Sequence, residues 1–316
     1  MDKKIIAGIA VAATGLAAAA TLAGSYVAYR MAFLTDREAQ EKGYQVPDRY
    51  TEEEGKTVKG LMDELRAIPY KDVWVRSHDG LKLHGKYYHV AEGAPLEIQF
   101  HGYNGNTIRD FCGGNKIGRE AGHNTLVVDQ RAHGMSEGET ISFGIKERYD
   151  CLAWIDYAIR HFGKDVKIIL AGVSMGAATV LMATELDLPS NVVCVIADCS
   201  YSSPEAIIKK VARDRKIPVA PAFPFLRLGA RIFGRFGLRD SSAVEAVKRS
   251  KVPVLIIHGE EDSFVPFEMS KEIYEACASE KAYFPVPKAG HGMSYIVDTD
   301  GYEKAVKEFI GDKLKI

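Results

Sequence analysis

Residues 167–183 constrain the fold of this chain more than any other segment. The segment begins with a β-branched apolar run at 167–171 that is typical of a buried strand. The run leads into Gly172-Val-Ser174-Met-Gly176 and then into an alanine-rich stretch that is typical of a helix. A serine on such a sharp strand-to-helix turn presents its hydroxyl at the end of a sheet, and the flanking glycines allow the two elements to approach closely. The segment therefore predicts a sheet covered by helices, with Ser174 as a nucleophile at its edge.

Strands and helices alternate along the rest of the chain. We expect strands at 73–76, 81–90, 96–100, 124–128, 192–197, 254–257 and 282–286, and helices at 51–66, 107–120, 147–161, 267–277 and 300–313. Such alternation specifies an α/β fold with a doubly wound, mostly parallel sheet. Ligands of such sheets bind beyond the carboxyl ends of the strands.

A serine hydroxyl is a weak nucleophile unless a base removes its proton, and an acid must hold that base in one tautomer. Of the nine histidines, His291 is the preferred base because it lies in a Gly-His-Gly turn between the last strand and the last helix. Asp262, which follows the penultimate strand, is the favoured acid. Asp198, at the end of the strand before it, is the alternative.

Catalysis by such a serine also requires hydrogen-bond donors for a tetrahedral oxyanion. The backbone amide of Met175, directly after the serine, is expected to be one donor. The amide of Tyr103, in the loop after the strand at 96–100, is expected to be the other. The alternative for Tyr103 is a side chain that only forms the wall of a pocket.

Residues 201–245 interrupt the alternation of strands and helices. They lie between two strands and combine prolines with a large apolar content, which favours a helical cap inserted over the active site. The cap is basic, with nine basic and two acidic residues from Glu205 to Arg239. We expect it to present a solvated charged face or, alternatively, to contact a membrane and admit lipid-like esters. Four arginines at every fourth position predict one helical face, namely Arg227, Arg231, Arg235 and Arg239.

The N-terminal segment predicts a membrane anchor. Lys3 and Lys4 precede an uncharged run, residues 5–29, which reaches the ~20 residues that a bilayer span needs. The run exceeds the roughly 7–15 apolar residues of a cleavable signal peptide, which is the alternative. We therefore expect 1–30 to be a single-pass anchor or signal segment, 31–66 a juxtamembrane linker and helix, and 67–316 the main domain. The flanking positive charges slightly favour an extracytoplasmic main domain.

Five motifs in this order resemble those of the α/β-hydrolase superfamily. The resemblance extends from about Trp74 to Phe309, and it implies Ser174 as nucleophile, His291 as base and Asp262 as acid. The chain is most similar to membrane-anchored bacterial hydrolases of the prolyl-oligopeptidase-like and acyl-esterase branch. The motifs are His101-Gly-Tyr103, Asp129–Ser136, Gly172–Gly176, His258–Pro266 and Gly290–Gly292.

The sequence thus predicts a serine hydrolase that cleaves small acyl esters through an acyl-enzyme. A serine peptidase or amidase, a thioesterase, and a non-catalytic membrane-anchored interaction protein are the alternatives. A net charge of −1 argues against a basic nucleic-acid binder. The sequence has no glycine-rich phosphate loop and no metal-spaced His/Cys cluster, so we expect no cofactor and no metal. The five scattered cysteines are expected to be buried free thiols.

Overall fold

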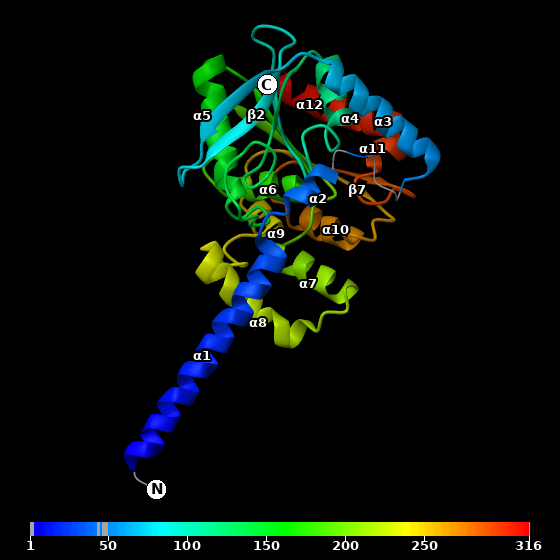
Figure 1. The fold of residues 1–316 in the computed structure, drawn as a ribbon. Helices are drawn as coiled ribbons and strands as arrows, with labels where there is room; N and C mark the ends of the chain where they lie inside the picture. The colour runs from blue at the N-terminus through cyan, green and yellow to red at the C-terminus, as the bar shows by residue number, and fades with distance from the viewer. Residues whose placement is uncertain (1–2, 43–44, 46–49, 316) are drawn as a thin grey trace.

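One eight-stranded sheet organises the protein in this computed structural model, which describes residues 3–42, 45 and 50–315 and, in the first helix, side chains from residue 15 onward (Figure 1). The strand order is β1-β2-β4-β3-β5-β6-β7-β8. β2 pairs antiparallel with β1 and β4, and all other neighbours are parallel. The predicted α/β fold with a mostly parallel sheet is confirmed. The strands are β1 (Lys71–Arg76), β2 (Lys82–Tyr88), β3 (Leu96–Phe100), β4 (Asn124–Val128), β5 (Ile168–Val173), β6 (Val192–Asp198), β7 (Val254–Gly259) and β8 (Lys281–Val286).

The parallel register brings the carboxyl ends of the central strands to one edge of the sheet. Phe100 at the end of β3 lies opposite Gly172 of β5, and Asp198 at the end of β6 lies opposite Val173. The next pair in the sheet joins Asp198 to Ile257 of β7. The loops that leave β3, β5, β6 and β7 therefore begin side by side, although they are far apart in the sequence.

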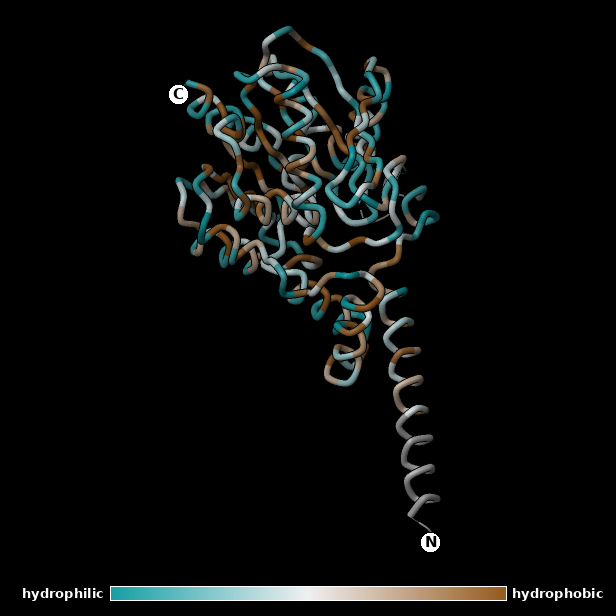
Figure 2. Tube along the Cα trace, turned by 90° about the vertical axis from the view of Figure 1, so that its left-hand side faces the viewer, coloured by the Kyte–Doolittle hydropathy of each residue, from teal (hydrophilic) through white to brown (hydrophobic). Residues whose placement is uncertain are grey.

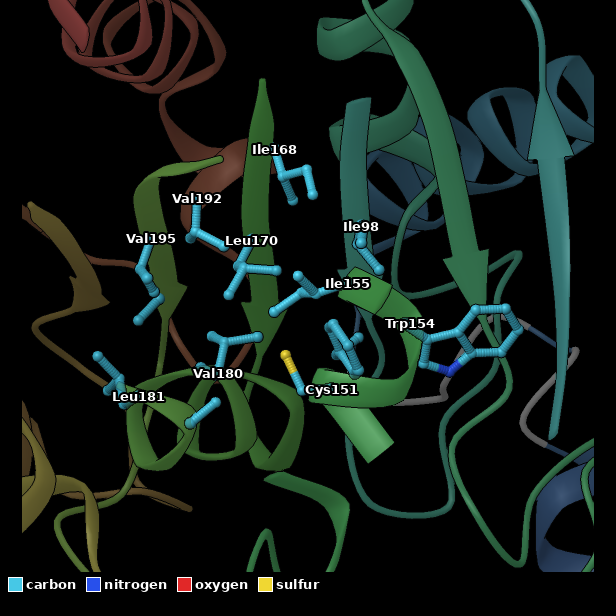
Figure 3. Close-up of a cluster of buried hydrophobic side chains, with 14 of the residues drawn as sticks. Ile98, Cys151, Trp154, Ile155, Ile168, Leu170, Val180, Leu181, Val192 and Val195 are labelled. Carbon is cyan, nitrogen blue, oxygen red and sulfur yellow. The ribbon is translucent and has the colours of Figure 1, made fainter. Parts of the chain in front are cut away.

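One face of the sheet is covered by α5 (Glu147–Phe162), α6 (Met175–Ala183) and α10 (Phe267–Ala276). Trp154 and Ile155 of α5 and Val180 of α6 belong to the buried core that includes Leu170 of β5 (Figure 3). Removing this much apolar surface from water stabilises the sheet against these helices.

The opposite face of the sheet is covered by α3 (Glu52–Ala67), α4 (Cys112–Glu120) and α12 (Thr299–Leu314). Met62, Ile117 and Ile310 from these helices are buried in one cluster with Ile169 of β5. Neighbouring residues of β5 thus point to opposite cores, which is why the strand is a continuous apolar run rather than an alternating one. α4 begins five residues later than the sequence predicts, because the expected start at 107 lies in turns.

The segment between β6 and β7 forms helices, as the sequence predicts for a cap, but its basic residues are arranged differently. Arg227 lies in α8, whereas Arg235 has a left-handed φ of 56° that ends the short π-helix η1. Arg239 lies beyond both and donates hydrogen bonds to the Glu205 carboxylate. The prediction of one basic helical face is therefore wrong. The elements of this segment are α7 (Pro204–Asp214), α8 (Val219–Gly229), η1 (Ala230–Gly234) and α9 (Ala243–Val247).

The first helix, α1 (Lys3–Phe33), projects from the globular part at its N-terminal end and packs on α8 and η1 at its C-terminal end (Figures 1 and 2). Ser25 and Tyr29 are buried in this contact, and Phe33 is buried beside it against Phe143 and Phe236. Gly229 of α8 is essential to it, because a Cβ there would lie 2.3 Å from the Ser25 carbonyl oxygen. The end of α1 is therefore part of the tertiary structure.

The prediction of an N-terminal membrane anchor is wrong. Among the residues that the structure describes, no helix is both long and apolar enough to cross a bilayer. The side chains of residues 1–14 lie outside the part of the chain that the structure describes. Within residues 25–33, Ser25, Tyr29 and Phe33 are buried against the rest of the protein. The extracytoplasmic location that depended on this anchor is overturned with it. Residues 43–44 and 46–49 of the expected linker also lie outside the description.

The segment after α1 is bound to the loop that follows β4. The Thr35 amide donates to the Glu139 carbonyl at 2.8 Å, and the Ile141 amide donates to the Phe33 carbonyl at 2.8 Å. The Tyr29 hydroxyl lies 2.5 Å from the hydroxyl of Thr140. These contacts fix where the chain enters α2 (Arg37–Lys42) and how α1 is oriented.

Candidate active site

Ser174 lies on the sharp turn between β5 and α6. Its backbone has φ 56° and ψ −113°, a strained conformation for a residue with a side chain. The turn depends on its two glycines. A Cβ on Gly172 would lie 2.3 Å from the carbonyl carbon of Gly176, and a Cβ on Gly176 would lie 1.8 Å from the Phe100 carbonyl oxygen. The strain is held in place by the surrounding sheet, since the Ser174 amide donates to the Asp198 carbonyl at 2.8 Å.

The structure brings Ser174, His291 and Asp262 together in one hydrogen-bonded chain. His291 Nε2 lies 3.0 Å from Ser174 Oγ, and His291 Nδ1 lies 2.7 Å from Asp262 Oδ2. The serine follows β5, the aspartate follows β7 and the histidine follows β8. An ionised carboxylate only accepts, so Nδ1 carries the proton and the Nε2 lone pair faces the serine hydroxyl.

The electrostatic surroundings keep Asp262 ionised. Burial alone would raise the pKa of this carboxyl, but hydrogen bonds from His258 and His291 outweigh burial and hold its pKa well below the usual value. The amides of Phe264 and Val265 also donate to Oδ1, at 2.9 and 2.8 Å. The His291 ring and these two amides thus fix the orientation of the carboxylate, and His258 Nε2, which hydrogen-bonds the Val265 carbonyl, lies 3.3 Å from Oδ2.

Asp198 is placed differently from Asp262. Its carboxylate accepts a hydrogen bond from the Ser294 hydroxyl at 3.3 Å, and its side chain is 5% exposed. Burial raises the pKa of Asp198 to about 6, and the nearby His258 and His291 only partly oppose this. Asp198 therefore lies beside the hydrogen-bonded chain, while Asp262 is the carboxylate that contacts His291.

The loop after β3 carries Tyr103 to the same edge of the sheet. A Cβ on Gly102 would lie 3.3 Å from the Ser174 Cβ, so this loop passes directly beside the serine. The Gly102 amide donates to Asp110 Oδ2 at 2.9 Å, and Asp110 pairs with Arg109. The Tyr103 ring stacks on Phe143, with ring centroids 5.2 Å apart.

Two buried histidines form hydrogen bonds with the backbone of this loop. His133 Nε2 accepts the Asn104 amide at 3.1 Å, while its Nδ1 donates to the Arg131 carbonyl. Burial lowers the pKa of His133 to about 3, so the ring is neutral and Nε2 can accept. His101 Nδ1 donates to the Gly102 carbonyl at 2.8 Å. Both histidines contact the backbone of neighbouring loops, so they have a structural role.

Met175 is the first residue of α6 and is fully buried. Amides in the first turn of a helix have no partner within the helix, and the helix dipole favours negative charge at this end. Ser174 and Tyr103 line the same two cavities, so a carbonyl group bound at Ser174 Oγ would lie near both the α6 terminus and the β3 loop.

Two cavities meet at Ser174. One, of about 340 Å³, exposes polar and apolar surface in nearly equal amounts, and we call it the polar cavity because its lining includes His291, Asn104 and Arg109. The other, of about 240 Å³, lies under the cap and is lined mostly by apolar side chains, although Arg215 also belongs to its lining. Two larger grooves, of about 920 and 840 Å³, lie on the cap surface, and their linings include Arg213 and Arg239.

Among the residues that the structure describes, two groups of side chains have the spacing of metal ligands. Cys199, Asp262 and His291 offer ligand atoms within 4.8 Å of one another, but the latter two are already hydrogen-bonded to each other. His78, Asp79 and Asp150 form the second group. In this group Asp79 and Asp150 both accept hydrogen bonds from the guanidinium of Arg131, so the positive charge beside these two carboxylates is that of the arginine.

The sequence missed part of the apolar cavity. Ala28, Met31 and Ala32 of α1 belong to its lining, although the segment was expected to be separate from the site. The signal in the sequence is the spacing of Tyr26, Tyr29 and Phe33, which places three aromatic rings on one side of a helix.

The sequence pattern that defines the alpha/beta hydrolase family matches residues 100–305. The chain is 28% identical over 192 residues to the uncharacterized protein YqkD of Bacillus subtilis. That match covers 60% of this chain and 63% of YqkD, slightly less than two thirds of its length. Protein bem46 of Schizosaccharomyces pombe is 24% identical over 224 residues, which are 70% of this chain and 69% of bem46.

Solved structures of esterases share the fold. An esterase of Pyrococcus furiosus superimposes with a TM-score of 0.64 at 22% identity, and the match covers 85% of this chain and 96% of the esterase. Est1E of Butyrivibrio proteoclasticus, solved with bound ferulic acid, gives a TM-score of 0.60 at 24% identity over 77% of this chain and all of the other.

Proposed function

The chain belongs to the alpha/beta hydrolase family, and from this premise we propose that it is a serine hydrolase that cleaves carboxylic esters through an acyl-enzyme. The observation that carries the proposal is the hydrogen-bonded chain from Asp262 through His291 to Ser174 on the strained turn. The esterases among the structural neighbours support the ester substrate only through the shared fold. Membership of the acyl-esterase branch stays a prediction.

In the proposed first half-reaction, Ser174 Oγ attacks the ester carbonyl carbon while its proton moves to His291 Nε2. The carbonyl oxygen becomes an oxyanion, which the amides of Met175 and Tyr103 stabilise. Asp262 stabilises the positive imidazole that results. His291 then protonates the leaving alcohol, the carbon–oxygen bond to that alcohol breaks, and the acyl group remains on the serine.

In the second half-reaction a water replaces the alcohol. His291 removes a proton from this water, which attacks the acyl-enzyme carbonyl and forms a second oxyanion in the same place. Collapse of this intermediate returns the proton to Ser174 Oγ and releases the carboxylic acid. The same three side chains therefore act in both halves, and the reaction consumes one water per ester.

A fluorophosphonate probe tests the nucleophile, because an activated serine displaces its fluoride and becomes phosphonylated. We expect the full-length chain to be labelled and Ser174→Ala to remain unlabelled. A wild-type chain that is folded but takes no label would overturn the proposal.

Turnover of p-nitrophenyl acyl esters compared with aminoacyl anilides tests the substrate class. We expect esters to be cleaved with the higher kcat/KM. Faster cleavage of the anilides would reassign the activity to a peptidase or amidase.

A further inference from the structure

We propose that the C-terminal turns of α1 form one wall of an acyl-binding pocket, and that Ala28 and Ala32 limit the length of the acyl chain that the enzyme accepts. The inference rests on the proposed function and extends it to the substrate's acyl group. Four observations carry it: the lining of the apolar cavity, the side of Ser174 on which His291 lies, the size of the cavity, and the rigid attachment of α1.

The lining identifies the chemistry of the ligand. The cavity is lined by side chains of α1, α7 and α8, and Ser174 belongs to the same lining. The cap contributes side chains such as Ile207, Phe223 and Leu226. A surface of this kind favours a hydrocarbon chain, because burying apolar surface is worth about 25 cal/mol per Å².

The position of His291 decides which part of the ester occupies this cavity. His291 must protonate the leaving alcohol, so the alcohol lies on the side of Ser174 that His291 faces. His291 lines the polar cavity, together with Asn104 and Arg109. The alcohol therefore leaves through the polar cavity, and the acyl chain extends into the apolar one under the cap.

The volume sets the expected chain length. A cavity of about 240 Å³ holds roughly eight heavy atoms, if each takes about the 30 Å³ that a water molecule occupies in the liquid. Ala28 and Ala32 are small and separated by one helical turn, so larger side chains at these positions would project into the space that the chain needs. Met31, which is 68% exposed, lies at the rim of the same wall.

The attachment of α1 makes this wall a fixed one. Phe33 is buried between Phe143 and Phe236, with ring centroids at 5.9 and 5.2 Å. Tyr29 contacts Phe233 of η1, and its hydroxyl lies 2.5 Å from that of Thr140. Because α1 is fixed in this way, it does not move aside for a longer acyl chain, which therefore does not fit in the cavity.

The test is the acyl-chain profile of p-nitrophenyl esters from acetate to dodecanoate, measured on the full-length chain. We expect the wild type to prefer chains of about six to eight carbons. Ala28→Leu and Ala32→Leu should each lower kcat/KM for octanoate relative to acetate by about tenfold or more, since one methylene in an apolar pocket is worth about that factor. Leu226→Ala, which enlarges the cavity from the α8 part of its lining, should shift the preference toward longer chains.

Ala20→Leu is the matched control, because Ala20 lies on the same helix but is exposed. It should leave the profile unchanged. Fluorophosphonate labelling of each variant separates the two proposals. Variants that are labelled like the wild type but keep its chain-length profile within twofold would overturn the acyl pocket alone. Absence of labelling in the wild type would overturn the proposed function and the pocket with it.

Discussion

The two cavities that meet at Ser174 are built in different ways. The polar cavity is formed largely by loops at the carboxyl edge of the sheet, and its key groups are fixed by short hydrogen bonds. The apolar cavity is formed by α1 and the cap, whose contacts are mainly between apolar and aromatic side chains. The hydrogen bonds of the polar cavity hold individual polar atoms in defined positions. The apolar packing around the other cavity determines only its size and its apolar character. Changes on the polar side should therefore act on the reaction rate, and changes on the apolar side on substrate choice and stability.

The largest effect is expected from Asp262→Asn, which removes the charge that holds the His291 tautomer. We expect kcat to fall by about 10⁴-fold, with KM nearly unchanged. Asp198→Asn is the matched control, since it changes the same group on the neighbouring strand end and should retain most of the activity. Steady-state kinetics on a p-nitrophenyl ester measures both. The reverse pattern would reassign the acid to Asp198.

Phe33→Ala tests the apolar side through stability. Phe33 is fully buried, and its loss should lower the free energy of unfolding by about 3 kcal/mol. Urea unfolding checks this. Leu16→Ala is the control, because Leu16 is 74% exposed and should change stability by no more than about 0.5 kcal/mol. Equal effects of the two substitutions would show that the end of α1 is not packed on the cap.

Asp110→Asn tests how the β3 loop is held. The Asp110 carboxylate accepts the Gly102 amide and pairs with Arg109, and these charges hold its pKa below the usual value against the effect of burial. With a neutral amide in its place, the loop should shift away from the oxyanion. We expect kcat to fall by up to about 10²-fold while fluorophosphonate labelling persists at a lower rate. An unchanged kcat would mean that Asp110 does not position this loop.

The smallest effect is the pH dependence that Asp198 contributes. Its pKa is raised from 3.8 to about 6 in the folded state, so between these values the folded protein holds a proton that the unfolded chain has lost. Its contribution to stability therefore falls as pH rises from about 4 to about 6, by on the order of 2 kcal/mol. Asp198→Asn lacks this loss, so its thermal midpoint should increase relative to the wild type over that pH range. A difference between the two that does not vary with pH would contradict the raised pKa.

The strands and the strand-to-helix turn were predictable because their signals are local. A continuous apolar run followed by Gly-x-Ser-x-Gly specifies β5, the turn and α6 without knowledge of any other segment. The alternation of such units implies a parallel sheet, and a parallel sheet brings its carboxyl ends together. Ser174 and His291 could be proposed for that reason before any distance was known, with Asp262 favoured as the acid and Asp198 left as the alternative.

The arrangement of the cap and of α1 was not predictable in the same way. The four-residue spacing of Arg227, Arg231, Arg235 and Arg239 assumes one continuous helix, but the chain departs from α-helical geometry after Gly229. Glycines at 229, 234 and 237 indicated a weak helix without showing where it would end. The pairing of Arg239 with Glu205 depends on how α7 and the loop after η1 meet in three dimensions.

The sequence by itself determined the α/β class, the position of the serine and the order of its partners along the chain, because backbone periodicity and turn geometry are properties of short segments. Only the tertiary structure decided what residues 25–33 contact. The hydrophobic effect is non-directional, so an apolar helix gains from leaving water whether lipid or protein surrounds it. The sequence shows that this segment is apolar. The tertiary structure shows that its last turns pack against the protein and line a cavity that also contains Ser174.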